Sequence, residues 1–364
     1  MASYGREKEF RSVIISKANQ ALFSCNVVSR CLVDSRRSTG ELPTLRSGRM
    51  ILNTSMKSEN AGDAIIMHFA KKQFATIFPS ERFDEIPTHG SWVEIGKDKA
   101  SWIKIVCGTN ALSTNAVLDC AIAFPKDVSK YRKSLLLMAA GLRYVHGRKR
   151  FTPLTSRFLE YALCDDVMHS VRDENTKLHL EEIGIKNVLN TSCVTMWGLT
   201  PEACARIPRT KADCVLTTVT DYAQDPVKDK VMLETLMKRY KKVYLWLQGA
   251  GDRNYVEAIV DSGRIEMIDG SFSDLQEFVV GRNEYIDYIG TRLHCGIFCL
   301  NEGIRSVIVC VDNRALDIHN DTGLPILMRD EVPEGLNEVI DSSAPTKIEL
   351  PLDSIEAWKG QFVF

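Results

Sequence analysis

The stretch YIDYIGTRLHCGIFCL at residues 285–300 decides the fold of this chain, because it holds a strand, a turn and a helix in succession. Residues 285–289 are a short apolar run typical of a buried strand, and an apolar helix continues from Cys295 to Leu300. The turn between them places Arg292 and His294 at the start of the helix. Unpaired N–H groups and the positive dipole end favour anions there, so we expect chemistry rather than packing at this turn.

Strand and helix patterns alternate along the chain on both sides of this stretch. Strict alternation is typical of parallel sheets whose two faces are covered by helices. The proline-bearing segment 200–208 separates two such series. We therefore predict an α/β protein with two doubly wound, Rossmann-like domains. The predicted strands are 50–53, 102–107, 134–140 and 167–171 in the first series, and 214–219, 243–247, 265–268, 285–289 and 307–311 in the second.

The same pattern gives the expected domain boundaries. We assign residues 50–199 to an N-terminal domain and residues 200–335 to a C-terminal domain. Residues 1–49 are an N-terminal extension whose role is open. In the tail 336–364, Ile355, Trp358 and Phe362 recur at helical spacing. We expect this tail to pack back on the N-terminal domain.

The composition is that of a globular protein of about two domains, with 364 residues, 45% of them apolar and 26% charged. A formal net charge of -1 gives no bulk electrostatic reason to expect nucleic acid or an anionic membrane as partner. The 11 cysteines are scattered through apolar runs, which is typical of reduced thiols. No run approaches ~18 apolar residues and the first residues lack a secretory core, so we expect a cytoplasmic protein without a transmembrane segment.

Ligands of parallel α/β sheets bind outside the carboxyl ends of the strands. Several polar loops follow predicted strands in this chain and could face one inter-domain cleft. They are Asn60–Asp63, Gly108–Asn110, Arg172-Asp173, Gln248–Asp252, Thr291–His294 and Asp312–Arg314.

Taken in order, these loops resemble the polysaccharide pyruvyl transferase family over about residues 50–330. The motifs that carry the resemblance are Asn60-Ala-Gly-Asp63, Ser170-Val-Arg-Asp-Glu174, Cys193-Val-Thr-Met-Trp197, Trp246-Leu-Gln-Gly249, Gly290-Thr-Arg-Leu-His294 and Val311-Asp-Asn-Arg-Ala315. The chain departs from the family where Glu59 precedes Asn60, and where Gly108-Thr109-Asn110 replaces a glycine triplet.

The resemblance implies a two-domain, GT-B-like fold with a cleft, and transfer of the enolpyruvyl unit of phosphoenolpyruvate to sugar hydroxyls as a pyruvyl ketal. It places the donor at Arg292 and His294, with Thr291 and Leu293 in the same turn, and makes Arg172 a further donor contact. The partners would be phosphoenolpyruvate and a sugar or lipid-linked glycan in surface polysaccharide (exopolysaccharide) or glycoconjugate synthesis. Which sugar accepts the unit is open, as is a homo-oligomeric state.

The chemistry needs these residue types. Phosphoenolpyruvate carries a phosphate and a carboxylate, which arginine binds in bidentate fashion, so Arg172, Arg292 and Arg314 are candidate donor contacts. A histidine, with an ordinary pKa of ~6.5, can give and take the proton, which makes His294 the catalytic candidate. Asp63 is a candidate base. We expect no metal and no cofactor beyond the donor substrate, because arginines can neutralise the leaving phosphate. The candidates for acceptor binding are Asn60, Asn110, Gln248 and Asp252.

Each of these residues has an alternative structural interpretation. His294 could cap a helix or lie in a core, and Arg292 could form an ion pair with Asp287 or Asp312. Arg172 could pair with its neighbours Asp173 and Glu174. Asn60 and Asp63 could cap the helix that follows them, and Gln248 and Asp252 could only shape a turn. Cys295 and Cys299 could bind a metal or be buried core thiols. Trp197 could stack on a sugar or pack in the core.

Two other functions stay open from the sequence. A glycosyltransferase of similar two-domain fold would use a nucleotide sugar, and it would need a base-stacking and ribose-binding loop that the second domain does not reveal. A non-catalytic binding protein could keep the fold without turnover.

Overall fold

The computed structural model describes residues 25–27, 29–34, 42–90 and 92–363, so much of the extension 1–49 lies outside the described residues. The chain divides into two compact units. Unit 1 contains the described residues up to Lys57, Ala75–Asn190 and the chain from Glu356 onward. Unit 2 contains Ser58–Phe74 and Thr191–Ile355, so it takes in the beginning of the first long helix.

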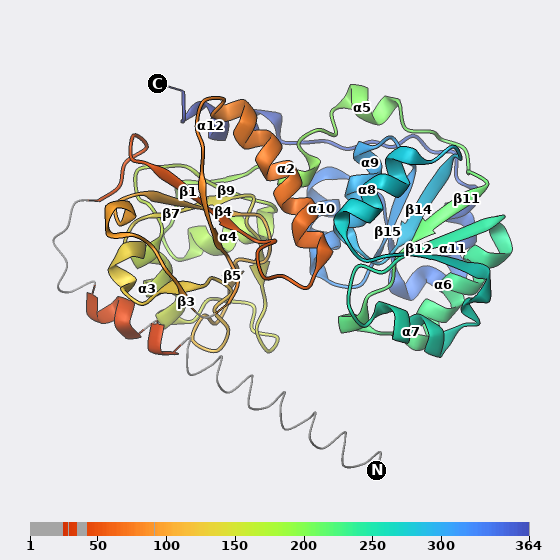
Figure 1. Cartoon of the computed structure of the whole chain (residues 1–364), viewed down its shortest axis with the longest axis horizontal. Coiled ribbons are helices and arrows are strands. Elements are labelled where there is room, and N and C mark those ends of the chain that lie inside the picture. Colours follow the sequence, from red (N-terminus) through yellow and green to blue (C-terminus); the bar gives the residue numbers. More distant parts are fainter. Residues whose placement is uncertain (1–24, 28, 35–41, 91, 364) are drawn as a thin grey trace, which may run out of the picture. The chain divides into compact units, whose positions relative to one another are not determined.

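In unit 2 strands and helices alternate along the chain, as predicted (Figure 1). In unit 1 the predicted alternation was wrong, because the described residues between 84 and 143 form strands and short 3-10 helices but no α-helix. The strands of unit 1 are β1 (Arg49–Asn53), β2 (Asp84–Pro87), β3 (Trp92–Val93), β4 (Ile103–Cys107), β5 (Leu112–Ser113), β6 (Phe124–Pro125), β7 (Leu135–Met138), β8 (Leu142–Arg143), β9 (His169–Val171) and β10 (Val188–Asn190), and its helices are α3 (Pro153–Ala162) and α4 (Glu174–Glu182). Helix α2 (Ala61–Ile77) begins in unit 2 and ends in unit 1, as does α12 (Leu352–Gly360). The strands of unit 2 are β11 (Cys214–Thr217), β12 (Lys242–Trp246), β13 (Ile265–Ile268), β14 (Ile286–Gly290), β15 (Ser306–Cys310) and β16 (Ile326–Met328). Its helices are α5 (Pro201–Ala205), α6 (Pro226–Arg239), α7 (Asp252–Ile259), α8 (Phe272–Gly281), α9 (Leu293–Asn301), α10 (Asn313–Thr322) and α11 (Val332–Asp341).

Unit 2 is a doubly wound sheet. Its six strands are parallel and lie in the order β13-β12-β11-β14-β15-β16, so the order reverses between β11 and β14. Numbered along the chain, this is the 3-2-1-4-5-6 order of the Rossmann fold. The predicted α/β class with Rossmann-like topology is confirmed here.

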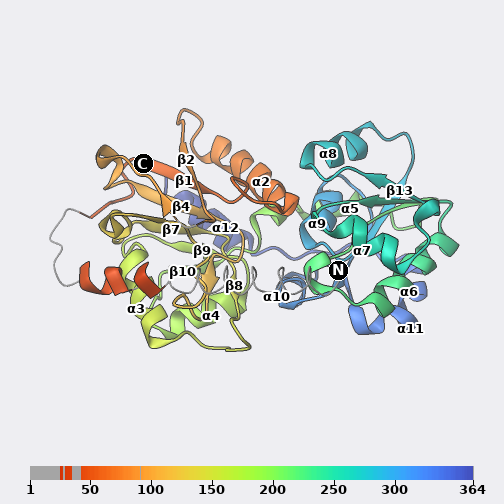
Figure 2. The same cartoon turned by 60° about the horizontal axis from the view of Figure 1, so that its bottom comes forward.

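Alternate residues of each strand face opposite layers of helices. Cys214 and Leu216 of β11 belong to one core with α8 and α9, whereas Val215 between them belongs to the other core with α6 and α11. Side chains alternate in this way because successive residues of a strand point to opposite faces. Figures 1 and 2 show α6 and α11 side by side on their face of the sheet.

Unit 1 contains a parallel sheet of order β2-β1-β4-β7 and a parallel pair, β9 and β10. Side chains join β7 to β9: the Leu137 N–H donates to Nδ1 of His169 at 3.2 Å, and the Ala139 N–H donates to the Ser170 hydroxyl at 2.8 Å.

Burial lowers the pKa of His169 to about 4. The ring is therefore neutral, and its Nε2 donates to the carbonyl of Cys164 at 2.9 Å.

The end of the carboxyl-terminal helix α12 and the residues just after it are anchored in unit 1. Gln361 exchanges hydrogen bonds with both backbone groups of Met168, at 2.9 and 3.1 Å. The Phe362 ring lies edge-on to Phe78 at 5.0 Å between centroids, and Trp358 is completely buried. Trp358 and Phe362 are both buried, which explains why they recur at helical spacing in the sequence.

The cysteines are free thiols, as their positions in apolar runs of the sequence predicted. All 11 cysteines are free and ten are buried, including Cys295 and Cys299, which are core residues of unit 2.

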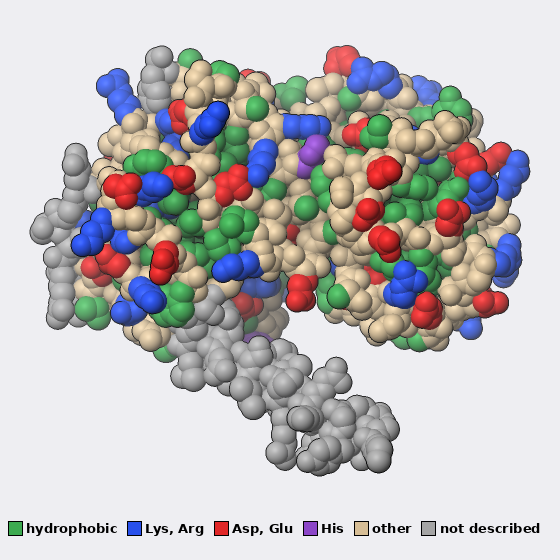
Figure 3. All heavy atoms as spheres, viewed as in Figure 1, with side chains coloured by type: hydrophobic (Ala, Val, Ile, Leu, Met, Phe, Trp, Pro, Cys, Tyr) green, Lys and Arg blue, Asp and Glu red, His purple; other side chains and the backbone are tan. Residues whose placement is uncertain are grey.

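Positive and negative side chains are interspersed over the face seen in Figure 3. None of the helices within the described ranges is both long and apolar enough to cross a bilayer.

A buried lysine makes the stability of unit 1 depend on pH. Lys104 of β4 is fully buried, its Nζ donates to the carbonyl of Ala100 at 2.6 Å, and burial lowers its pKa to about 7. Between pH ~7 and ~10.4 the unfolded chain binds a proton here that the folded chain does not, so stability rises with pH across this window.

We expect Lys104→Met to raise the free energy of unfolding at pH 7 by roughly 2–4 kcal/mol and to flatten its rise toward pH 10. Denaturant unfolding at several pH values measures both effects. The exposed Lys149 of the same unit provides the control, Lys149→Met. An unchanged pH slope in Lys104→Met would show that this lysine keeps an ordinary pKa.

Candidate active site

The candidate site of unit 2 lies at the carboxyl ends of its central strands. Parallel sheets of this kind bind ligands where the strand order reverses, which here is between β11 and β14. Arg292 follows β14, Asp221 follows β11 and Asp252 follows β12. Three strand ends therefore bring charged side chains to one place.

Arg292 is the centre of this cluster, with 4% of its surface exposed. Its Nη2 donates to Asp252 at 2.7 Å and to Asp221 at 2.9 Å, and its Nε donates to the carbonyl of Val219 at 2.7 Å. Burial raises the pKa of the Asp252 carboxyl, while the charge of Arg292 opposes that rise. Among the described residues no hydrogen bond uses Nη1 of Arg292, which leaves this nitrogen for a ligand.

The ion-pair partners that the sequence suggested for Arg292 were wrong. Asp287 instead pairs with Arg305 at 3.0 Å, and Asp312 pairs with Arg314 at 2.5 Å. Asp287 lies in β14, just before Arg292, and Asp312 follows the next strand, β15, but the order of the strands decides which carboxylates reach Arg292.

Glycine leaves room where the Arg292 side chain passes the loop after β12. A Cβ on Gly249 would lie 2.5 Å from Nη2 of Arg292 and 2.9 Å from a carboxylate oxygen of Asp221. A Cβ on Gly251 would also lie 2.9 Å from Asp221. The Trp246-Leu-Gln-Gly249 motif thus keeps room for the buried ion pair.

An exposed tyrosine contacts both predicted donor-binding arginines of unit 2. The Tyr222 ring is 57% exposed, and its centroid lies 5.1 Å from Cζ of Arg292 and 5.8 Å from Cζ of Arg314. Arg314 also donates a hydrogen bond to the Tyr222 hydroxyl. Guanidinium groups are attracted to aromatic faces, so Tyr222 holds two of the predicted donor contacts in one cluster.

The other residues of the Thr291–His294 turn differ in their surroundings. The buried Thr291 hydroxyl lies 2.7 Å from that of Thr220, and Leu293 is a core residue. His294 is 8% exposed, and its Nε2 lies 3.9 Å from the sulfur of Cys193. Thr291 and Leu293 thus fix the backbone of the turn, and their predicted contact with a ligand stays a prediction.

The start of α2 contacts the loop after β12 within unit 2. Oδ1 of Asn60 accepts from the Gly62 N–H at 3.0 Å, so Asn60 caps the helix, and it also accepts from Nε2 of Gln248 at 2.7 Å. Asp63 lies in the first turn of the helix, and its carboxylate accepts from the Ser58 hydroxyl at 2.6 Å. The predicted residues Asn60, Asp63, Gln248, Asp252, Arg292, His294 and Arg314 therefore all belong to unit 2.

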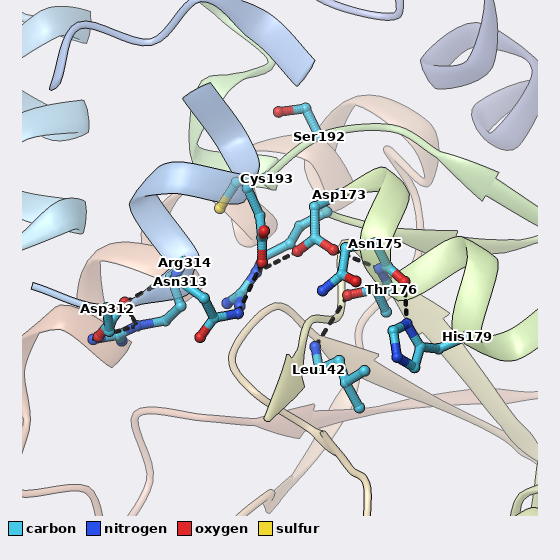
Figure 4. A network of polar contacts seen from close by, with 12 residues as sticks. Leu142, Asp173, Asn175, Thr176, His179, Ser192, Cys193, Asp312, Asn313 and Arg314 are labelled. Atoms are coloured by element: carbon cyan, nitrogen blue, oxygen red, sulfur yellow. Dashed lines mark hydrogen bonds and ion pairs between the residues drawn. The ribbon is translucent and has the colours of Figure 1, made fainter. Parts of the chain in front are cut away.

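In unit 1, Arg172 follows β9 and is 1% exposed. Its Nε donates to Asp173 at 3.1 Å, whereas its buried Nη2 has no hydrogen-bond partner in the described part of the chain. A Cβ on Gly141 would lie 2.2 Å from Cζ of Arg172, so this glycine makes room for the guanidinium. Figure 4 shows Asp173 at the start of α4, where it accepts from the Thr176 N–H at 2.7 Å.

Asn110 lies on the loop after β4, and the residue before it, Thr109, is hydrogen-bonded to the backbone of Gly141. The carbonyl of Thr109 accepts from the Gly141 N–H at 2.8 Å. Thr109 adopts a left-handed backbone with φ of 52°, which is costly for a β-branched residue and free for glycine. Oδ1 of Asn110 is buried and has no partner among the residues described.

A cavity of about 580 Å³ lies at the opposite, amino ends of β11, β12 and β14. Lys242, Glu284 and Tyr285 are among the residues that line it. Hydrogen bonds from Lys242, Cys214 and Tyr244 lower the pKa of Glu284 to about 2. None of the predicted site residues lines this cavity, and parallel sheets seldom bind substrate at this end.

Sequence reasoning missed Asp221, Tyr222 and Cys193 as members of the cluster. Asp221 and Tyr222 stand after β11, and their place at a strand end was the signal that could have identified them. Cys193 belongs to a motif that was noted, but its contact with His294 joins residues 101 positions apart. Trp197 of that motif is a core residue whose indole N–H donates to the carbonyl of Thr191 at 2.8 Å.

Parallel α/β units with arginines at the carboxyl ends of their strands are typical of proteins that act on anionic substrates. The chain belongs to the polysaccharide pyruvyl transferase family, because the model of that family matches residues 60–313. The protein is therefore a transferase, as the resemblance predicted. A comparison with curated proteins gives no match.

Several solved structures are similar to this chain at low sequence identity. S. aureus MnaA in a co-structure with UDP has 11% identity and a TM-score of 0.42, over 81% of this chain and 88% of that chain. The UDP-GlcNAc 2-epimerase of Neisseria meningitidis bound to UDP-GlcNAc has 11% identity and a TM-score of 0.44, over 80% and 91% of the two chains. The enzyme of the same name from Methanocaldococcus jannaschii has 12% identity and a TM-score of 0.45, over 82% and 94%.

The contact between Gly249 and Arg292 predicts the effect of one added methyl group. We expect Gly249→Ala to lower the free energy of unfolding by about 1–3 kcal/mol, because the new Cβ must displace the buried ion pair. Gly281→Ala at the end of α8 is the control, since a Cβ there has no atom within 4 Å. Denaturant unfolding compares the two variants, and equal midpoints would mean that Arg292 is not held against Gly249.

Proposed function

We propose that this protein transfers the enolpyruvyl unit of phosphoenolpyruvate to two hydroxyls of a sugar, giving a pyruvyl ketal and free phosphate. Membership of the polysaccharide pyruvyl transferase family supports a glycan acceptor. The acceptor is a sugar or a lipid-linked glycan of polysaccharide synthesis.

The observation that carries the proposal is the incomplete hydrogen bonding of Arg172. A buried guanidinium nitrogen without a partner costs about 1–3 kcal/mol or more, because its desolvation is not compensated. A phosphate or carboxylate oxygen would supply the missing acceptor. Nη2 of Arg172 is such a nitrogen, and Gly141 leaves its guanidinium the room it needs.

In unit 2, Arg292 and His294 have distinct roles in the proposal. Arg292 presents Nη1 to the anionic donor, with Arg314 beside it on the Tyr222 ring. His294 gives a proton to the methylene carbon of the donor. Asp63 serves as the base that takes the proton of the attacking hydroxyl.

The reaction balances with these groups alone. The donor methylene gains the proton from His294, and a sugar oxygen forms a bond to the adjacent carbon as its own proton leaves to the base. Phosphate then departs with the electron pair of its C–O bond, and the second hydroxyl closes the ketal ring as it loses its proton. Histidine and carboxylate can both shuttle protons near neutral pH.

The full chain with phosphoenolpyruvate and a panel of methyl hexopyranosides tests the function. Release of phosphate together with the mass of a pyruvyl ketal on one glycoside is the expected result. Titration calorimetry with phosphoenolpyruvate and, separately, with UDP-GlcNAc gives an independent readout. Binding of UDP-GlcNAc and none of phosphoenolpyruvate would overturn the proposal in favour of a nucleotide-sugar enzyme.

Two substitutions separate donor binding from proton transfer. We expect Arg172→Lys to raise KM for phosphoenolpyruvate about tenfold or more, because an ammonium cannot reproduce the planar fork. The exposed Arg150 of the same unit supplies the control, Arg150→Lys.

We expect His294→Gln to lower kcat by about 10²- to 10⁴-fold while the dissociation constant of phosphoenolpyruvate changes little. Circular dichroism and the melting temperature check that each variant folds. Wild-type turnover in His294→Gln would remove the histidine from the mechanism.

A further inference from the structure

A second buried polar atom without a partner lies on the loop after β12. Gln248 is 5% exposed, and its Nε2 donates to Oδ1 of Asn60 at 2.7 Å. Its Oε1 is buried, and no hydrogen bond within the described ranges reaches it. Buried carbonyl oxygens are nearly always paired, so a missing partner points to a group that is absent from the protein itself.

The backbone determines which end of the Gln248 amide is unpaired. The Gly62 N–H donates at 3.0 Å to the same Oδ1 of Asn60. Since a backbone N–H can only donate, the Asn60 atom it meets must be the carbonyl oxygen. Gln248 must then present its NH2 to that oxygen, and the orientation is not an arbitrary choice between nitrogen and oxygen.

The start of α2 lies close to the amide pair. The Ala61 N–H lies 3.5 Å from the backbone carbonyl of Gln248, which ties the loop to the first residue of α2. A Cβ on Gly62 would lie 2.8 Å from Nε2 of Gln248 and 3.1 Å from Oδ1 of Asn60. Glycine at this position therefore lets the helix start close over the amide pair.

The missing partner must be a hydrogen-bond donor. The oxygens of a carboxylate or of a fully ionised phosphate ester carry no proton, so such a group would be repelled by Oε1 rather than bound. A sugar hydroxyl has the proton that Oε1 needs. The next residue, Gly249, lies against the guanidinium of Arg292, so Gln248 is adjacent in sequence to a residue that contacts the Arg292 ion-pair cluster.

We propose that Oε1 of Gln248 accepts a hydrogen bond from one hydroxyl of the sugar acceptor, with Asn60 holding the amide in place. The inference rests on the proposed function, because that function makes the acceptor a sugar. It adds a subsite that selects a neutral hydroxyl by an acceptor atom and turns anionic groups away.

The test uses the full chain, methyl hexopyranosides and their monodeoxy analogues, first without phosphoenolpyruvate. Ligand-observed NMR gives the dissociation constant of each glycoside, and acceptor KM follows in the presence of donor. We expect Gln248→Met to weaken binding of the preferred glycoside about 2- to 12-fold, which corresponds to the ~0.5–1.5 kcal/mol of one hydrogen bond. Gln276→Met on α8 is the matched control.

A double-mutant cycle identifies the hydroxyl. Loss of one hydroxyl from the glycoside should weaken binding to the wild type by the same factor as Gln248→Met, and should weaken binding to Gln248→Met no further. Asn60→Asp keeps an acceptor oxygen for Nε2 and should bind normally. Asn60→Ala frees the Gln248 amide and should reproduce the loss without a change in the binding of phosphoenolpyruvate.

Different failures have different meanings. If every deoxy analogue loses as much on Gln248→Met as on the wild type, Oε1 is filled by a buried water only and the subsite does not exist. Absence of glycoside binding to the wild type overturns it as well. If the ketal forms and acceptor KM is unchanged in Gln248→Met, the inference fails while the proposed function stands. If glycosides bind through Gln248 but phosphoenolpyruvate gives no ketal, the proposed function fails instead.

Discussion

The burial of the Arg292 guanidinium is the constraint on which the site of unit 2 depends. Removing a charge from water costs several kcal/mol unless carboxylates and hydrogen bonds replace the solvent. Here the replacements are Asp252, Asp221 and the Val219 carbonyl. They stand after β12 and β11, while Arg292 stands after β14. The three strands must therefore keep their order and register for the arginine to be buried at all.

This constraint extends into the loops and the neighbouring helix. Nη2 of Arg292 lies where a Cβ on Gly249 would stand, so the glycine leaves space for the guanidinium. The residue before it, Gln248, is hydrogen-bonded to Asn60 at the start of α2. Further along α2, Ile65 and Phe69 belong to the same core as Leu293 of α9. The first turn of α2 and the turn after β14 are thus parts of one packed structure. A shift of either would move both the Arg292 ion-pair cluster and the unpaired amide oxygen.

The periodic parts of the fold could be predicted from the sequence, and the side-chain pairings could not. Every strand of the second predicted series is present, because each is a buried apolar run flanked by turn residues. Strands β2, β3, β5, β6, β8, β10 and β16 were missed. Residues Asp84–Pro87 of β2 hold two acids and a proline, and β16 is only three residues long. Local pattern carries little information about such short edge strands.

The candidate site shows the same division. Arg292 and His294 could be chosen because a helix start after a buried strand is a local feature. The partners of Arg292 lie 71 and 40 residues away, and only the strand order β12-β11-β14 brings them to it. No spacing in the sequence gives that order. Asp287 stands on the strand that Arg292 follows, and Asp312 follows the next strand along the chain, yet order along the chain does not measure distance in a parallel sheet.

The arginines that the sequence treated as equivalent differ in their electrostatics. Two carboxylates neutralise Arg292, so its attraction for an anion is weak at long range and its value lies in the fixed direction of one remaining N–H. Arg172 meets one carboxylate, at Nε, and its Nη2 has no acceptor among the described residues. An anion that bonded to Nη2 would relieve a cost already present in the folded protein, whereas an anion at Arg292 would have to share a guanidinium with Asp252 and Asp221. Arg172 is thus the better candidate for affinity toward the donor, and Arg292 is better suited to orient it.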